Sequence, residues 1–191
     1  SNHDLRYQDE VHGNLFEQVD AVLDLLYTKY LKAVITYEGL QRVETFPYPR
    51  AALREALLNA LVHRDYSTGV PIQISVYDHQ LVLWNAGHLS DDWSVERLLG
   101  KHPSAPFNPL IANAFFRAGF IESWGRGIEK IREECRSHGI ADPEVDASLS
   151  GLMLTFRASA DYVKALRKDP GTETAANKTS EAPPDSRAGT S

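Results

Sequence analysis

Apolar residues follow a helical period near the start of the chain. One stripe runs along residues 15–30 and consists of Leu15, Phe16, Val19, Val22, Leu23, Leu26 and Tyr30. Asn14, with Glu17 three residues later, resembles a capping box at the start of this helix. The segments 33–37 and 41–46 have the pattern of short extended pieces around a turn. The first part of the chain is therefore expected to form a helix followed by two short strands.

The middle of the chain changes from helical to alternating periodicity. Pro49 is suited to the start of a second helix over 50–63. After the turn at 67–69, apolar and polar residues alternate at Ile72, Ile74 and Val76. The apolar run 81–84 then predicts the second strand of a hairpin, which 85–87 is expected to end.

Two more helices and a second hairpin are predicted in the second half. The proline-containing connection 91–107 has one short helical stretch at 95–99. Asn108 is expected to cap a helix with Pro109 in first position and Gly119 at its end. A further helix is expected from Gly127 to Gly139, with Ile128, Ile131 and Cys135 turned inward. The segments 143–149 and 152–157 predict a hairpin that turns at Ser150-Gly151, and 161–167 predicts a last short helix.

This order of elements favours an α+β fold, because helices and adjacent hairpins are mixed rather than strictly alternating. We expect a two-layer sandwich in which a mixed, mainly antiparallel sheet is covered on one face by helices. Residues 14–168 are expected to form one domain. Residues 1–13 are taken as an extension that can be tag-derived, and 169–191 as a disordered tail, because that tail has no apolar side chain larger than Ala apart from its prolines.

Composition narrows the class of protein. The net charge is −6, of which the tail carries −2, and this acidic balance disfavours binding of nucleic acid by broad electrostatics. A single cysteine, Cys135, excludes a disulfide framework and a multi-cysteine zinc site. No apolar run approaches the roughly 20 residues that span a bilayer. We therefore expect a cytoplasmic globular domain.

The second predicted helix carries a polar stripe. At about 100° per residue, Glu55, Asn59 and His63 fall within an arc of roughly 80°, and Leu53, Leu57 and Leu61 lie opposite. Such a stripe is either a solvated face or a functional one. Ala56 and Ala60, which flank it, would leave room for a ligand. A carboxylate there can take a proton from water, and an amide oxygen can ligate Mg²⁺.

Two glycine-bearing turns follow this helix. Asn85-Ala86-Gly87 ends an apolar strand, and Gly125-Arg126-Gly127 opens an amphipathic helix. Backbone N–H groups at a helix N-terminus can bind an anion, and Arg126 can reach a phosphate. Each turn is equally explained as an ordinary tight turn. Neither a Walker A loop nor a Rossmann fingerprint is present.

In this order, the motifs resemble those of the GHKL ATPase superfamily, which includes gyrase, Hsp90, histidine kinases and MutL. The phrases 54–66, Lys101-His102-Pro103, 108–112 and 124–128 resemble a divergent branch, the C-terminal ATPase-like domain of RecG-like proteins and of Alba/Schlafen-type transcriptional regulators. The resemblance covers roughly 14–158. It implies a Bergerat-type sandwich and a nucleotide-binding regulatory domain.

The resemblance also implies roles for individual residues. Glu55 matches the water-activating base and Asn59 the ligand of Mg²⁺ bound with ATP. Asn85 stands where the superfamily has the Asp that reads adenine, and Gly87 matches the first glycine of that box. Gly125 and Gly127 match the phosphate-binding glycines, with Arg126 between them, and 90–123 would be the lid. The cluster His63-Arg64-Asp65 is either structural or a phosphate or metal contact.

Two departures from the superfamily leave two functions open. Asn85 lacks the charge of an Asp, and Leu89 replaces a glycine, so the domain is either an ATPase or a module without nucleotide turnover that acts in protein–protein assembly. A plain α+β domain with an incidental polar stripe is the remaining alternative. A histidine kinase is disfavoured, because helix 14–30 offers no phosphoacceptor His. In relatives of this type an Alba-like domain precedes and a winged-helix domain often follows. We therefore expect a fragment that does not itself contact DNA and that can form a homodimer.

Overall fold

The computed structural model describes residues 8–87, 100, 106–122, 125–147 and 151–168. The first helix, α1 (Leu15–Leu25), begins at Asn14 and ends in a wide helical turn over Leu26–Tyr30. Asn14 Oδ1 accepts hydrogen bonds from the backbone N–H groups of Phe16 and Glu17 at 3.1 and 3.0 Å. The Glu17 carboxylate accepts the Asn14 N–H in return, at 3.3 Å. The predicted capping box is confirmed.

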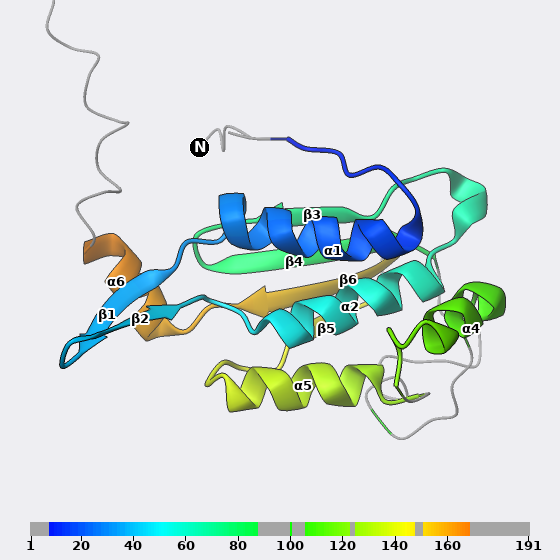
Figure 1. Ribbon diagram of the computed structural model, residues 1–191. Coiled ribbons are helices and arrows are strands. Elements are labelled where there is room, and N and C mark those ends of the chain that lie inside the picture. Colours follow the sequence, from blue (N-terminus) through cyan, green and yellow to red (C-terminus); the bar gives the residue numbers. More distant parts are fainter. Residues whose placement is uncertain (1–7, 88–99, 101–105, 123–124, 148–150, 169–191) are drawn as a thin grey trace, which may run out of the picture.

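Helix α2 (Arg50–His63) lies at the centre of the fold and has the predicted bounds. Pro49 stands immediately before it in extended conformation. The helix is buried nearly all round, through Ala52, Leu53, Ala56, Leu57, Leu58, Ala60, Leu61 and Val62. Helices α1 and α5 (Gly127–Ser137) contact it along its length, and all three lie over one face of the main sheet (Figure 1).

The main sheet has four antiparallel strands in the order β3-β4-β6-β5. These are β3 (Gln73–Val76), β4 (Gln80–Ala86), β6 (Gly151–Arg157) and β5 (Glu144–Asp146). Alternate residues of β4 and β6 enter the core, so that Leu81 pairs with Phe156 and Leu83 with Leu154. The expected α+β sandwich is confirmed, and every strand pair in the described part is antiparallel.

Two predicted boundaries were wrong. Gly151, which was expected in the turn of the last hairpin, is the first residue of β6, because it pairs with Ala86. The strand that 85–87 was expected to end continues through Asn85 and Ala86, because both residues pair with β6, Asn85 with Leu152 and Ala86 with Gly151. Cross-strand pairing therefore extends β4 beyond its apolar run. Asn85 consequently belongs to the sheet and lies on the same side of β4 as Leu81 and Leu83.

The remaining elements surround this core. Helix α4 (Pro109–Arg117) packs near one end of α2, and α6 (Ala160–Lys168) follows β6. The strands β1 (Val34–Glu38) and β2 (Gln41–Thr45) form a separate two-stranded sheet. Ile131 and Cys135 of α5 are fully buried and Ile128 packs against the core, as predicted.

Several predictions concern residues outside the described ranges. They are the helical stretch at 95–99, Leu89, residues 90–99, 101–105 and 123 of the proposed lid, and the tail at 169–191. Among the described helices, none is both long enough and apolar enough to cross a membrane.

Candidate functional site

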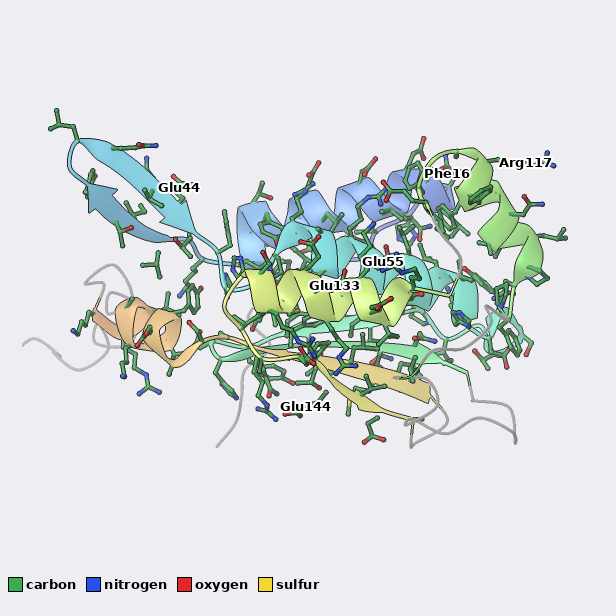
Figure 2. All side chains as sticks on the ribbon, turned by 90° about the horizontal axis from the view of Figure 1, so that it is seen from below. Phe16, Glu44, Glu55, Arg117, Glu133 and Glu144 are labelled. Atoms are coloured by element: carbon green, nitrogen blue, oxygen red, sulfur yellow. The ribbon has the colours of Figure 1, made fainter. Side chains whose placement is uncertain are left out.

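The polar stripe of α2 faces another helix rather than solvent. The Glu55 side chain is only 12% exposed, and it lies where α5 packs on α2 (Figure 2). The interpretation of the stripe as a solvated face is therefore wrong. Ala56 and Ala60, which would leave room for a ligand, are instead buried in the core, so their small size serves protein packing.

Asn59 lies directly against the first residue of α5. A Cβ added to Gly127 would stand 2.4 Å from Asn59 Nδ2 and 2.7 Å from Oδ1. The amide is held in place because Nδ2 donates to the Glu55 carbonyl at 2.9 Å and reaches Glu55 Oε1 at 3.4 Å. Only glycine at 127 allows α5 to approach this side chain so closely.

Glu55 is a largely buried carboxyl group beside a lysine of α5. Lys130 Nζ lies 3.7 Å from Glu55 Oε2 and 3.5 Å from Glu122 Oε2. Burial raises the pKa of Glu55, and the positive charges of Lys130 and Arg54 only partly oppose this increase. A carboxyl group with a raised pKa is suited to proton transfer near neutral pH.

Lys130 was missed by sequence reasoning. It comes three residues after Gly127, which places both on the same side of α5. Because Gly127 contacts Asn59, other residues on that side of α5 also lie near the polar stripe of α2. The signal could have been read from helical spacing once α2 and α5 were known to pack together.

Asn85 is a buried polar residue with an unused acceptor. Its side chain is 1% exposed, and Nδ2 donates to the carbonyl of Ala86 at 3.3 Å. Oδ1 receives no hydrogen bond from the residues that the structure describes. An unpaired buried carbonyl costs about 1–3 kcal/mol, so a ligand with an amino group would relieve this cost.

The C-terminal end of α2 meets the end of β4. The backbone N–H of Asp65 donates to the carbonyl of Ala86 at 2.8 Å. A Cβ on Gly87, whose φ is +148°, would lie 3.1 Å from the carbonyl oxygen of His63 and 3.8 Å from Asn85 Nδ2. His63, Asn85 and Gly87 are thus brought together, one helical turn beyond Asn59.

Arg64 and Asp65 have structural partners at this helix end. The guanidinium of Arg64 stacks over the ring of Tyr66, 4.7 Å from its centroid. Asp65 Oδ1 accepts hydrogen bonds from the backbone N–H and the hydroxyl of Ser67, at 2.9 and 2.6 Å. These contacts favour the structural reading for Arg64 and Asp65, whereas the role of the half-buried His63 stays a prediction.

Asn108 corrects a prediction. It stands before α4 with Pro109 in first position, but its side chain makes no capping bond there. Its Nδ2 instead donates to the carbonyls of Val62 and Arg64 at 2.9 and 2.8 Å. The last carbonyls of a helix lack donors, so the amide side chain joins the end of α2 to α4.

The glycine turn before α5 has the backbone shape of a tight turn. Gly125 has φ +74°, and Arg126 precedes the first helical residue. Arg126 Nε donates to Glu129 Oε2 at 2.9 Å on the surface. Arg126 therefore lies at the helix N-terminus as predicted, although Glu129 already supplies negative charge there.

The donor set fits a nucleotide with a hard ion. Asn85 offers a buried acceptor to an amino group, and Asn59 offers an amide oxygen beside Glu55. Among the described residues, no group of three or more His, Cys, Asp or Glu side chains is placed to hold a metal by itself. Mg²⁺ would thus be shared with phosphate oxygens, its usual arrangement in such sites.

Fold and site together define an α+β domain in which the polar stripe of α2 packs against a helix that begins at a glycine. Residues 69–156 match the family described as "Putative ATP-dependent DNA helicase recG C-terminal". This match confirms the resemblance to the RecG-like, ATPase-like domain that the motifs indicated, over less than half of the chain. The stripe residues Glu55, Asn59 and His63 precede the matched segment.

The fold is similar to that of a solved structure. The crystal structure of the DIP2311 protein from Corynebacterium diphtheriae is similar to this chain with a TM-score of 0.67 and 23% sequence identity. The likeness covers 79% of this chain and 31% of that chain, and at this identity it concerns the fold alone. A search of curated proteins found no match.

Proposed function

We propose that this domain binds ATP with Mg²⁺ as the nucleotide-binding regulatory domain of a transcriptional regulator. The observation that supports this most directly is the buried Asn85 oxygen at the end of β4, which has no hydrogen-bond partner among the described residues. An adenine amino group is a donor of the kind that this oxygen lacks. The position is also the one that the family resemblance assigns to adenine recognition.

The proposal assigns a role to each residue of α2 and α5. Asn59 would hold Mg²⁺ through its amide oxygen, and the backbone at Gly125 and Gly127 would contact the phosphates together with Arg126. His63 and Gly87 would lie near the base, beside Asn85. Bound nucleotide supplies the phosphoryl group, and Glu55 would take a proton from the attacking water, a task that its raised pKa favours.

The regulatory part of the proposal rests on family and charge. RecG-like domains of this type occur in regulators with Alba-like and winged-helix domains. The chain has a net charge of −6, so DNA contact in such a regulator is assigned to other domains. The family resemblance is also the basis on which we propose a cytoplasmic location.

A module without nucleotide turnover is the second candidate. Two observations favour it. Asn85 is neutral, so its bond to an amino group would lack charge assistance. Glu55 is already engaged by Lys130 and by the Asn59 amide. In this case the site would hold nucleotide weakly or act in protein–protein assembly of the regulator.

Calorimetric titration with a non-hydrolysable ATP analogue and Mg²⁺ tests binding. Asn85→Ala and Asn59→Ala should each weaken binding at least tenfold, and Asn85→Asp should strengthen it by restoring a charged acceptor. Asn113→Ala, on the exposed side of α4, is the matched control and should bind as the unchanged chain does. If no binding is detected at millimolar nucleotide, both ATP hydrolysis and nucleotide binding without turnover are excluded.

Turnover is tested separately. If the chain hydrolyses ATP, Glu55→Ala should lower kcat by two orders of magnitude or more, in line with loss of a general base, while binding of the analogue persists. Binding without turnover in the unchanged chain would assign the domain to the sensor class. Unaltered hydrolysis in Glu55→Ala would remove Glu55 from the proposed role.

A further inference from the structure

The hairpin of β1 and β2 stands apart from the main sheet as an arm (Figure 1). Its base is anchored, because the rings of Tyr27 and Phe46 pack edge to face at 4.8 Å and the Tyr162 hydroxyl donates to the carbonyl of Lys32 at 2.6 Å. Beyond this base the two strands pair only with each other among the described elements. Figure 2 shows Glu44 on this arm, away from the helices of the core.

The arm exposes apolar side chains. Ile35 is 48% exposed, Tyr37 69% and Leu40, in the turn at the tip, 103%. A two-stranded sheet is only marginally stable in water by itself. Apolar residues gathered on such an arm indicate a surface that is covered in an assembly.

Within the described ranges, no strand pairs with the outer edge of β2. Glu38 and Gln41 form the last pair before a two-residue turn, so they exchange hydrogen bonds, and every second pair along the ladder does the same. The peptide groups of Arg42 and Glu44 therefore point away from β1. All β2 residues except the half-buried Val43 are exposed. This edge can accept another strand.

The charges on this edge are complementary to themselves. Arg42 and Glu44 flank Val43 and lie on one face, with Arg42 Nη2 2.6 Å from Glu44 Oε1. A two-fold axis at Val43 would place Arg42 opposite Glu44 of a second copy, and Glu44 opposite Arg42 of that copy. In the same register the outward N–H and C=O groups of these residues meet their counterparts.

We infer that β2 is a dimerisation edge: two copies of this chain pair their β2 strands antiparallel about Val43 and form a four-stranded sheet. Within each copy, Ile35 lies beside Glu44 and Tyr37 beside Arg42. In the four-stranded sheet, Glu44 of one copy faces Arg42 of the second copy. Opposite charges thus meet at the centre, and apolar residues line the same face on either side. The interface is isologous, as a two-fold dimer requires.

Charge reversal tests this pairing by analytical ultracentrifugation of the full chain. The unchanged chain should sediment as a dimer that dissociates on dilution. Arg42→Glu makes the edge wholly acidic and Glu44→Arg makes it wholly basic, so each variant alone should be monomeric at concentrations where the unchanged chain is dimeric. An equimolar mixture of the two variants should regain the dimer, because only the mixed pair brings opposite charges together.

The mixture separates pairing between chains from effects within the arm. The contact between positions 42 and 44 of one chain stays broken in both variants, so recovery on mixing reports the contact between copies alone. Arg117→Glu, a reversal on α4 at the other end of the molecule (Figure 2), is the control and should remain dimeric. Glu44→Pro, which removes an outward N–H while sparing the pairing with β1, should be monomeric.

Three results would contradict pairing through β2. A monomeric unchanged chain at millimolar concentration excludes the edge as a dimer contact. A dimer that survives both single reversals and Glu44→Pro places the interface elsewhere. A mixture that stays monomeric shows that the charges do not meet across a two-fold axis.

Discussion

Gly127 is pressed against the amide of Asn59: a Cβ at position 127 would lie 2.4 Å from Asn59 Nδ2. Two motifs that are separated by 68 positions in the sequence thus form a single contact between α2 and α5. The close packing against Asn59 explains why glycine occupies position 127, whether or not a phosphate binds there. The same contact holds Asn59 beside Glu55, where the proposed nucleotide site needs it.

Gly127→Ala should destabilise the fold by about 1–3 kcal/mol, the usual cost of overpacking. The backbone at 127 does not have a positive φ, so the cost reports the contact rather than backbone strain. Urea denaturation measures it. In an Asn59→Ala background the same substitution should cost markedly less, because the facing amide is gone. Equal costs in both backgrounds would contradict the contact.

Asn108→Ala should destabilise the chain by about 1–2 kcal/mol, because the carbonyls of Val62 and Arg64 lose their shared donor. Thermal unfolding measures the loss. Asn113→Ala, an exposed amide on α4 itself, is the matched control and should change stability by less than about 0.5 kcal/mol. Similar losses in the two variants would argue against the link between α2 and α4.

Glu55→Gln should stabilise the fold at neutral pH and lose that advantage in acid. The folded state raises the pKa of Glu55, chiefly by burial, so the native carboxyl binds its proton more tightly than the unfolded one does. Its contribution to stability therefore falls as pH rises through the raised pKa. Gln carries no charge at any pH and avoids this loss.

Urea denaturation between pH 4 and pH 8 tests the sign of this effect. The stability difference between Glu55→Gln and the unchanged chain should grow with pH. Glu133→Gln, on the exposed part of α5 (Figure 2), is the control. A Glu55→Gln variant that is less stable at neutral pH would mean that the pairing with Lys130 outweighs the cost of burial.

Cys135 should be unreactive in the native chain. It is fully buried, and burial raises the pKa of its thiol to about 11, so both access and thiolate are lacking. Labelling with a chromogenic disulfide at pH 8 should be at least about a hundredfold slower in buffer than in urea. Because Cys135 is the one cysteine of the chain, one equivalent should react on unfolding. Rapid native labelling would show that α5 opens readily.

Local sequence patterns predicted most of the elements. The capping box of Asn14 and Glu17 and the inward face of α5 depend on contacts within a few residues, so periodicity and residue type were sufficient. The end of β4 was misplaced because the pairing of Asn85 with Leu152 joins distant parts of the chain. The side chain of Asn108 went to α2 rather than α4 for the same reason.

The sequence by itself determined the α+β class, the order of helices and hairpins, and the motifs that identify a RecG-like, ATPase-like segment. These depend on the period of apolar residues and on short spacings, which survive without knowledge of the fold. Only the tertiary structure decided that the stripe of α2 faces α5, that Lys130 joins Glu55, and that the buried Asn85 oxygen has no partner in the described part of the chain. Burial and partnership arise from the packing of segments that are far apart in the chain, and no local pattern specifies which groups that packing leaves unpaired.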